Sequence, residues 1–342
     1  MEEIMLIDYE DYNVGNDTTE TASEVVAFQS HRSHMTDILL VVNSAICLLG
    51  VSGNGAVIWI AGFRMRRTVT TTWYLSLAVS DFLFCMCLPF SVVFMATSHW
   101  PFGSAMCKLT SCILFLNMFS SIFLLVLISV DRCASVTFPV WAQNHRKVRK
   151  ASVVVILAWV ASATLSMPSM FFREVKVHGN GTLCFTNYHT PSAHGAVALS
   201  RFVCGFAVPF LVIVSCYSII IQKLRGHRVT RSPKPFRVAS ALIAAFFICW
   251  LPYHVFVLLE INHTQHSVQV MKVGLEMGFT LAAANSFLNP ILYMFMGDNF
   301  RQKLRCSSML WRIENAMGED GNASTRCVSR SASMDGKATL YV

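Results

Sequence analysis

The sequence predicts an all-α membrane protein in which seven helices form a bundle across the bilayer. Hydrophobic residues make up 54% of the 342 residues and charged residues only 13%, whereas roughly 25% of a typical soluble domain is charged. Seven apolar stretches each exceed the roughly 20 residues that an α-helix needs to cross the hydrocarbon core. We place these stretches at 36–62, 70–97, 104–137, 149–170, 198–224, 236–260 and 268–296.

Several of the predicted spans contain a proline, which we interpret as a kink. These prolines are Pro89, Pro168, Pro209, Pro252 and Pro290. A proline inside a soluble helix costs roughly 3 kcal/mol, but neighbouring helices in a membrane bundle satisfy the backbone groups that it frees. The spans show no sequence repeat of the kind found in transporters, which disfavours a transporter or a channel.

The two ends of the chain are polar and are expected to lie outside the bundle. Residues 1–35 are acidic and lack the basic and then apolar pattern of a secretory signal, so we expect a disordered arm. Residues 36–297 form the membrane domain, and 298–310 are expected to form a short amphipathic eighth helix on the membrane surface. Residues 311–342 are expected to be a disordered tail.

Basic residues in the short connections predict the orientation of the bundle. They gather in the first, third and fifth connections and after the last span, at Arg64, Arg66, Arg67, Arg146, Lys147, Arg149, Lys150, Lys223, Arg225, Arg228, Arg231, Lys234, Arg237, Arg301, Lys303 and Arg305. We therefore expect a plasma-membrane protein with its N-terminus outside and its C-terminus in the cytoplasm. This topology accounts for the net charge of +8, and a nucleic-acid partner is not expected.

Glycosylation sequons agree with this orientation. Asn16, Asn180 and Asn262 each begin an Asn-x-Ser/Thr sequon in a region that is expected outside, where the asparagine accepts a glycan. The sequon at Asn322 falls in the cytoplasmic tail and is expected to stay unmodified.

Two short motifs carry a resemblance to a known family. Asp-Arg-Cys at 131–133 closes the third span, and Asn-Pro-Ile-Leu-Tyr at 289–293 lies in the last. An arginine and an aspartate at the mouth of a span are costly unless they have a function or a partner. Over about residues 36–305 the chain resembles the rhodopsin-like (class A) G protein-coupled receptors, which implies a signalling receptor, not an enzyme, with no required cofactor. This chain has Cys133 where most members of the family have a tyrosine, and several chemoattractant receptors have the same cysteine.

The resemblance implies a conformational switch. Arg132 is expected to leave its neighbour Asp131 and to meet two tyrosines, Tyr217 and Tyr293, when the inner mouth opens. The packing around a proline kink is expected to change between two states that an outside ligand biases. The switch residues implied are Asp131, Arg132, Tyr217, Phe246, Trp250, Asn289, Pro290 and Tyr293, with Ile122 and Pro209 in a packing connector beside Phe246.

Polar residues in the middle of the membrane form a second constellation. An ionised Asp81 in hydrocarbon needs a counter-charge or several hydrogen bonds. Matching positions in the resembled family hold a sodium ion, so Asp81, Asn117, Ser121, Asn285 and Ser286 are expected to bind sodium as an allosteric ligand, with Asn289 beside them. A water-filled polar network without an ion is the alternative.

The resemblance also implies a disulfide, and the position of a cysteine after the last span indicates a lipid anchor. Cys107 opens the third span and Cys184 lies in the second outer connection, and we expect a bridge between them on the oxidising side. Cys306 follows the amphipathic stretch after the last span and is expected to be palmitoylated; an unmodified thiol is the alternative.

Several outer and inner motifs are similar to the leukocyte chemoattractant receptors. The runs at 63–69, 99–103 and 139–146 look like those of formyl-peptide, chemerin, anaphylatoxin and prostaglandin D chemoattractant receptors. Pro-Tyr-His at 252–254 and Leu-Leu-Glu at 258–260 are most similar to the chemerin and prostaglandin members.

The expected ligand pocket suits a ligand with a carboxylate group. Leu114 replaces the aspartate of amine receptors, the seventh span has no lysine near Ala283 for retinal, and Phe115 replaces an aspartate of the formyl receptors. Arg201 matches a basic pocket residue of the cluster and suits a carboxylate held by two hydrogen bonds. A snorkelling or structural arginine is the alternative. The candidate ligand-binding residues are Phe115, Arg201, Tyr253, His254, Glu260 and Glu276, although Glu276 suits a pair with Lys272 equally well.

Both polar ends carry candidate modification sites. Tyr9 and Tyr12 are flanked by acids and resemble sulfation sites, and a sulfated arm would attract a basic protein ligand. The alternative is a plain solvated arm. We expect phosphorylation that depends on agonist, and then arrestin recruitment, at Ser324, Thr325, Ser329, Ser331 and Ser333.

The sequence therefore predicts a receptor for an extracellular chemoattractant peptide or small protein, chemerin-like or related. Signalling is expected through inhibitory-type G proteins and arrestin. A receptor for an acidic lipid such as a prostanoid is the alternative, because Arg201 suits a fatty carboxylate equally. An arrestin-only scavenger receptor is disfavoured, because the Asp131–Arg132 pair is intact.

Overall fold

The computed structural model describes residues 22–178, 181–226, 234–261 and 267–296. Side chains within these ranges are not described at 22–33, 178, 224–226, 234–237, 268–269 and 293–296. The predicted eighth helix, the tail and the sites at Tyr9, Tyr12, Asn16, Asn180, Asn262, Cys306, Ser324, Thr325, Ser329, Ser331 and Ser333 lie outside the described residues, as does the side chain of Tyr293.

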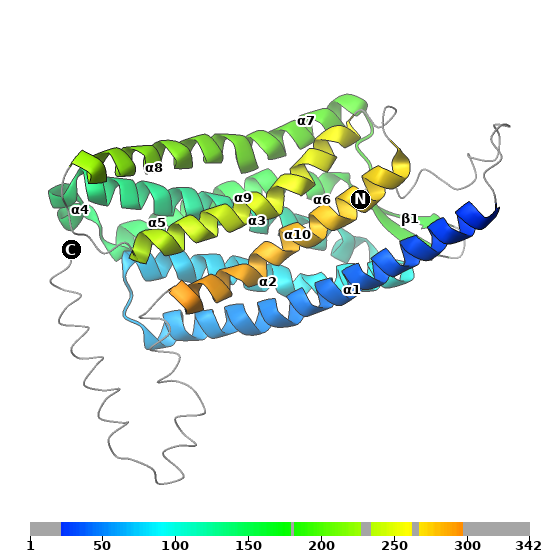
Figure 1. The fold of residues 1–342 in the computed structure, drawn as a ribbon, viewed down its shortest axis with the longest axis horizontal. Helices are drawn as coiled ribbons and strands as arrows, with labels where there is room; N and C mark the ends of the chain where they lie inside the picture. The colour runs from blue at the N-terminus through cyan, green and yellow to red at the C-terminus, as the bar shows by residue number, and fades with distance from the viewer. Residues whose placement is uncertain (1–21, 179–180, 227–233, 262–266, 297–342) are drawn as a thin grey trace, which may run out of the picture.

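Long helices lie side by side along the long axis of the molecule (Figure 1). The spans are α1 (Ala22–Trp59), α2 (Val69–Thr97), α3 (Gly103–Thr137), α5 (Val148–Ser166), the pair α7 (Pro191–Phe202) and α8 (Val208–Gly226), α9 (Lys234–Glu260) and α10 (Val268–Met296). Six are long and apolar enough to cross a membrane, and α10, at 29 residues, is also long enough. The predicted seven-helix bundle is confirmed.

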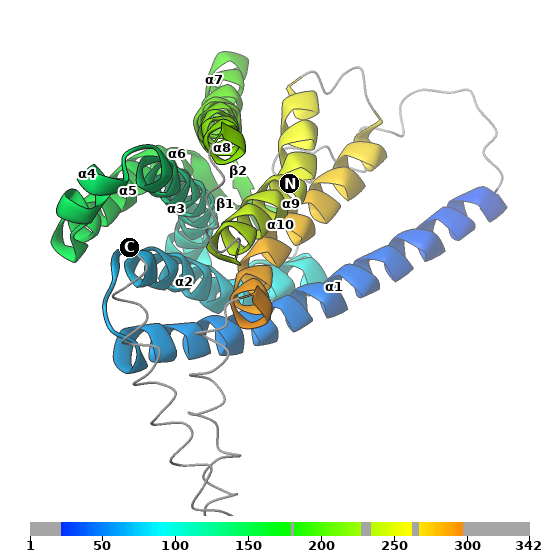
Figure 2. The ribbon, with the colours of Figure 1, turned by 60° about the vertical axis from the view of Figure 1, so that its left-hand side comes forward.

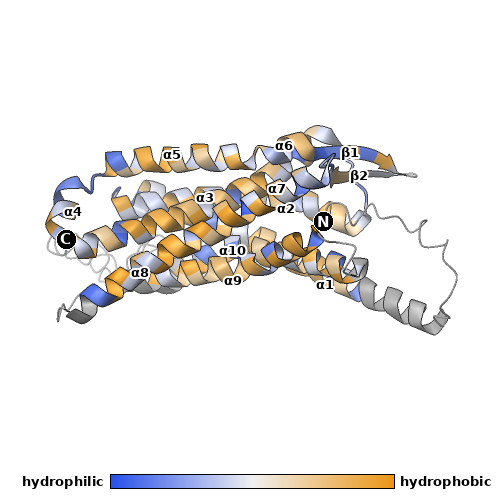
Figure 3. Ribbon diagram, turned by 90° about the horizontal axis from the view of Figure 1, so that it is seen from above, coloured by the Kyte–Doolittle hydropathy of each residue, from blue (hydrophilic) through white to orange (hydrophobic). Residues whose placement is uncertain are grey.

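Short elements mark the two ends of the bundle. An antiparallel hairpin of β1 (Arg173–His178) and β2 (Gly181–Thr186) lies at one end, next to the short α6 (Pro168–Phe172). The short α4 (Pro139–His145) lies at the opposite end (Figure 1). We call these the hairpin end and the α4 end. Apolar residues cover the middle of the helices, and hydrophilic residues gather at α4, at β1 and at the end of α8 (Figure 3).

The helix α3 runs through the centre of the bundle and packs against α2, α5, α8 and α9. Figure 2 shows α7 and α8 on one side of the bundle and α1 on the opposite side. Four large side chains, Phe119, Ile122, Phe246 and Trp250, are at most 1% exposed and belong to one apolar core between α3 and α9. Many apolar residues on the outer faces are exposed, as expected for surfaces that face lipid.

Several helices begin or bend where proline requires it. Pro89, Pro252 and Pro290 lie inside α2, α9 and α10, as expected for kinks. Pro168 instead begins α6, because α5 ends at Ser166. The helix α7 begins at Pro191, upstream of the predicted start at 198. Thr190 explains this start, because its side chain accepts a hydrogen bond from the Ala193 amide and caps the helix.

Two wide π-helical turns interrupt the spans. The turn η2 (Ile60–Arg64) ends the first span, and η3 (Val203–Ala207) joins α7 to α8. In η3 the amide of Val208 donates to the carbonyl of Val203, five residues back. The wide turn ends two residues before Pro209, which lacks an amide hydrogen, so the π turn and the proline together displace the regular α-helical hydrogen bonds.

The hairpin is tied to the bundle by the disulfide between Cys107 of α3 and Cys184 of β2. The buried Trp100 adds a second tie, because its amide donates to the carbonyl of Thr182 at 2.7 Å. Val175 stands opposite Cys184 in the hairpin register. The predicted disulfide is confirmed, and it holds the hairpin over the bundle next to α3.

We predict that Gly278→Ala destabilises the contact between α9 and α10. A Cβ atom at Gly278 would stand 2.9 Å from the Cα and 3.0 Å from the backbone nitrogen of Tyr253, so backbone would have to move. Overpacking of this kind costs about 1–3 kcal/mol. Thermal unfolding of the purified protein in detergent should show a lower melting temperature. Gly195→Ala in α7 is the control, because its Cβ would meet nothing within 4 Å.

Candidate functional site

A cavity opens at the hairpin end and contains both signs of charge. Its volume is about 110 Å³, and it lies between α1, α2, α3, α9, α10 and the hairpin. Phe84, Leu88 and Phe279 give it apolar walls. Its polar lining includes Ser91, Thr110, Ser111, Arg173, Lys272 and Glu276. A small set of polar groups among apolar walls is typical of a ligand site.

Arg201 lies in a separate, closed cluster. Its side chain is only 5% exposed, and its Cζ atom is 3.5 Å from the centre of the Phe115 ring. The guanidinium donates to the Tyr188 hydroxyl at 3.3 Å and to the Ser169 hydroxyl at 3.1 Å. Its Nε atom has no hydrogen-bond partner. Among the described residues no carboxylate lies within ion-pair distance of this buried charge, so the group lacks an anion.

His254 and Tyr253 join this cluster to the core. His254 is 2% exposed, its Nε2 atom has no hydrogen-bond partner, and its ring centre is 5.2 Å from that of Phe206. Tyr253 lines the cavity, and its ring contacts Trp250 edge to face at 5.8 Å. The ring of Trp250 stacks on that of Phe246, with 5.9 Å between the ring centres. A continuous aromatic path therefore runs from the cavity into the core.

The structure divides the predicted ligand-binding residues into groups. Tyr253 and Glu276 line the cavity, whereas Arg201, Phe115 and His254 do not. Glu260 is 4% exposed at the C-terminal end of α9 and also lies outside the cavity lining.

Sequence reasoning missed Arg173, which lines the cavity from β1. In the hairpin register Arg173 stands opposite Thr186, two residues after the bridged Cys184. A signal was present, because the disulfide places β2 over the bundle and any strand that pairs with β2 must also lie there.

The predicted sodium-binding residues form a buried polar network. Asp81 is fully buried and accepts hydrogen bonds from the amides of Asn117 at 2.9 Å and Asn289 at 2.7 Å. Ser286 donates to Asn117 at 3.3 Å. Ser121 Oγ and Asn285 Oδ1 are buried without a partner. Carboxylate, amide and hydroxyl oxygens are ligands of hard cations, so this set fits a sodium ion.

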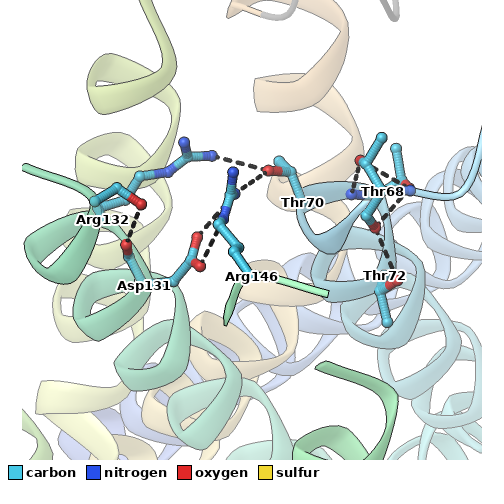
Figure 4. A network of polar contacts seen from close by, with 8 residues as sticks. Thr68, Thr70, Thr72, Asp131, Arg132 and Arg146 are labelled. Carbon is cyan, nitrogen blue, oxygen red and sulfur yellow. Dashed lines mark hydrogen bonds and ion pairs between the residues drawn. The ribbon is translucent and has the colours of Figure 1, made fainter. Parts of the chain in front are cut away.

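A network at the α4 end contains the predicted switch arginine. Arg132 Nη2 donates to the Thr70 hydroxyl of α2 at 3.3 Å. Asp131 does not hold Arg132 as expected; it pairs with Arg146, which follows α4 (Figure 4). Tyr217 of α8 lies within electrostatic range of Arg132. The sequence alone did not indicate that the third connection folds back onto Asp131.

Comparisons with known proteins agree with this architecture. The model of the 7 transmembrane receptor (rhodopsin family) matches residues 53–293. The human chemerin-like receptor 1 is 42% identical, with 94% of this chain and 93% of that protein covered. The C3a anaphylatoxin chemotactic receptor of Oncorhynchus mykiss is 42% identical, with 91% and 87% covered. The formyl peptide receptor 2 of Mus musculus is 38% identical, with 92% and 97% covered.

These similarities confirm the predicted resemblance to chemoattractant receptors, and the matched family is one of receptors rather than enzymes. The matched range begins in α1, ends in α10, and includes the cavity lining except Thr36, the Asp81 network and Arg132. The chain belongs to the rhodopsin family of seven-transmembrane receptors.

Proposed function

We propose that the protein is a plasma-membrane receptor for an extracellular chemoattractant peptide or small protein, and that it activates an inhibitory-type G protein and recruits arrestin. The relatives are named for chemerin, for C3a anaphylatoxin and for formyl peptides. All three names describe protein or peptide ligands, which favours that ligand class for a chain about 40% identical to each.

The proposed orientation puts the hairpin end outside and the α4 end in the cytoplasm. The α4 end carries Arg64, Arg66, Arg67, Arg146, Lys147, Arg149, Lys150 and Lys223. Basic residues in short connections favour the cytoplasmic side. The disulfide lies at the opposite end, which agrees with an oxidising exterior.

The uncompensated guanidinium of Arg201 is the observation that supports the ligand class most directly. A carboxylate would provide the anion that this buried cation lacks, and it would accept two parallel hydrogen bonds. Both a peptide C-terminus and a fatty acid have such a group. Glu276 gives the nearby cavity a negative charge beside Arg173 and Lys272, and a cavity with both charges favours a peptide over a fatty acid.

The aromatic path supplies a physical link between the two ends. A ligand in the cavity would press on Tyr253 and therefore on Trp250 and Phe246. These rings sit on α9 next to the Pro252 kink, where a helix changes direction at low cost. A shift of α9 would change the surroundings of Tyr217 and Arg132 at the α4 end and so alter what a G protein meets.

We predict that Arg132→Ala abolishes G protein activation while ligand binding at the cell surface persists. The reason is that Arg132 lies at the α4 end, far from the cavity, and acts only in the transmitted response. Suppression of cyclic AMP should be measured with chemerin, C3a, a formyl peptide and prostaglandin D2, together with surface expression. Normal suppression by a well-expressed Arg132→Ala variant would refute the proposed switch.

We predict that Arg201→Ala weakens binding of a carboxylate ligand by roughly 2–5 kcal/mol. Amidation of the ligand's carboxylate should weaken binding to the wild type and hardly change binding to the variant. Competition binding of the acid and of the amide to the wild type and to Arg201→Ala gives the four affinities of a double-mutant cycle. Strictly additive losses would mean that Arg201 acts only through Phe115, Tyr188 and Ser169.

We further propose that the Asp81 network binds a sodium ion as an allosteric ligand, which would supply the positive charge that the buried carboxylate lacks. Asp81, Asn117, Ser121, Asn285 and Ser286 would hold it. Sodium chloride should then raise the melting temperature of the purified receptor above its value in choline chloride. Asp81→Asn should remove this difference. Equal melting of the wild type in both salts would instead support a water-filled network.

A further inference from the structure

The α4 end has a single carboxylate among the residues whose positions are described. That carboxylate is Asp131, and two arginines, Arg132 and Arg146, are close enough to compete for it. The exposed cations at the same end are Arg64, Arg66, Arg67, Lys147, Arg149, Lys150 and Lys223. Which arginine holds Asp131 therefore decides the environment of the other.

Arg146 occupies both oxygens of Asp131. Its Nε atom is 2.8 Å from Oδ1 and its Nη2 atom is 3.0 Å from Oδ2, which is the parallel geometry that a guanidinium forms with a carboxylate. The Asp131 side chain is 12% exposed and that of Arg146 is 31% exposed. Figure 4 shows Arg146 lying between Asp131 and Thr70.

Arg132 is left with weaker, neutral partners. It donates to the Thr70 hydroxyl at 3.3 Å, and the same oxygen accepts a shorter bond of 2.9 Å from Arg146. Tyr74 of α2 lies beside the Arg132 guanidinium. The buried Nε atom of Arg132 has no hydrogen-bond partner. A hydrogen bond to a neutral hydroxyl is weaker than a charge-assisted pair with a carboxylate. Arg132 can consequently leave its present position more easily than if it were paired with Asp131.

We propose that Arg146 is a positioning residue of the switch. It keeps Asp131 from capturing Arg132 and so increases the fraction of receptors in which Arg132 is free to meet a G protein. This inference rests on the proposed function, because the role of Arg132 in signalling comes from there. Arg146 acts through Asp131 and need not touch the G protein.

The pairing itself is tested without any signalling assay. Melting temperatures of the purified receptor are compared for the wild type, Arg146→Ala, Asp131→Asn and the double variant. Arg146→Ala should lower the melting temperature more where residue 131 is an aspartate than where it is an asparagine, because the bond to Thr70 is lost in both backgrounds. Arg149→Ala is the matched control, an exposed arginine at the same end for which the structure shows no partner in its described part. Equal losses with and without the Asp131 carboxylate would overturn the pairing.

The positioning role is tested by nucleotide exchange without agonist on a purified inhibitory-type G protein. Loss of Arg146 should lower the exchange rate about fivefold, since an ion pair of this exposure shifts a two-state equilibrium by about that factor. Arg146→Lys should recover part of the rate, because lysine keeps the charge and loses the paired geometry. In the Asp131→Asn background, Arg146→Ala should have no effect.

Two outcomes would distinguish a failure of the positioning role from a failure of the proposed function. Unchanged or faster exchange in Arg146→Ala, with Asp131 intact, would overturn the positioning role even where the melting cycle shows the pair. A wild-type receptor that catalyses no exchange on any G protein, with chemerin, C3a, a formyl peptide or prostaglandin D2 present as well as without agonist, would refute the proposed function and with it the positioning role. The melting cycle would still decide whether Arg146 holds Asp131.

Discussion

The need of buried polar groups for partners inside the protein governs how these helices are joined. Membrane lipid offers no hydrogen bonds, so each polar side chain in the bundle must find its partner on another helix or on its own backbone. Asn43 and Asn54 of α1 reach Thr280 and the Ser286 carbonyl of α10. Trp159 of α5 reaches Ser76 of α2. Asp81 joins α2 to both α3 and α10. These few bonds fix neighbours that apolar packing alone would leave free to slide.

Several buried side-chain atoms of the described residues break this rule, and some of them lie at positions with a proposed function. Ser121 and Asn285 have an unpaired oxygen near Asp81, and Arg201 and His254 each have an unpaired nitrogen below the hairpin. Each of these four atoms lies where a ligand or an ion is proposed to bind. Arg132 adds an unpaired Nε where a partner protein is proposed to dock. The apolar core between these positions is tightly packed, so movement must occur by rearrangement of whole side chains rather than by gradual compression.

The spans could be predicted from sequence because a soluble protein of this length could not bury seven long apolar stretches. The Cys107–Cys184 bridge could be predicted from the family resemblance. The separation of Arg201 from the cavity could not be predicted, because it depends on how the side chains of α3, α7 and α9 pack, which the sequence pattern does not describe. The Asp131–Arg146 pair depends on the path of the third connection, which hydrophobic periodicity does not describe. The early start of α7 was readable, since a threonine before a proline is a helix-start signal, but the apolar pattern begins later and outweighed it.

The wide turn η3 also affects how this chain should be aligned with other proteins. It holds one more residue than an ordinary α-helical turn, and it stands between Arg201 and Pro209. In a protein with a regular α-helix at this place, the residue that precedes the proline by the same number of positions as Arg201 precedes Pro209 would lie on a different face of the helix. The basic residue that corresponds to Arg201 should therefore be identified by superposition of the helices, and a one-residue deletion within Val203–Ala207 would rotate the guanidinium by about 100° around the helix axis, away from Phe115.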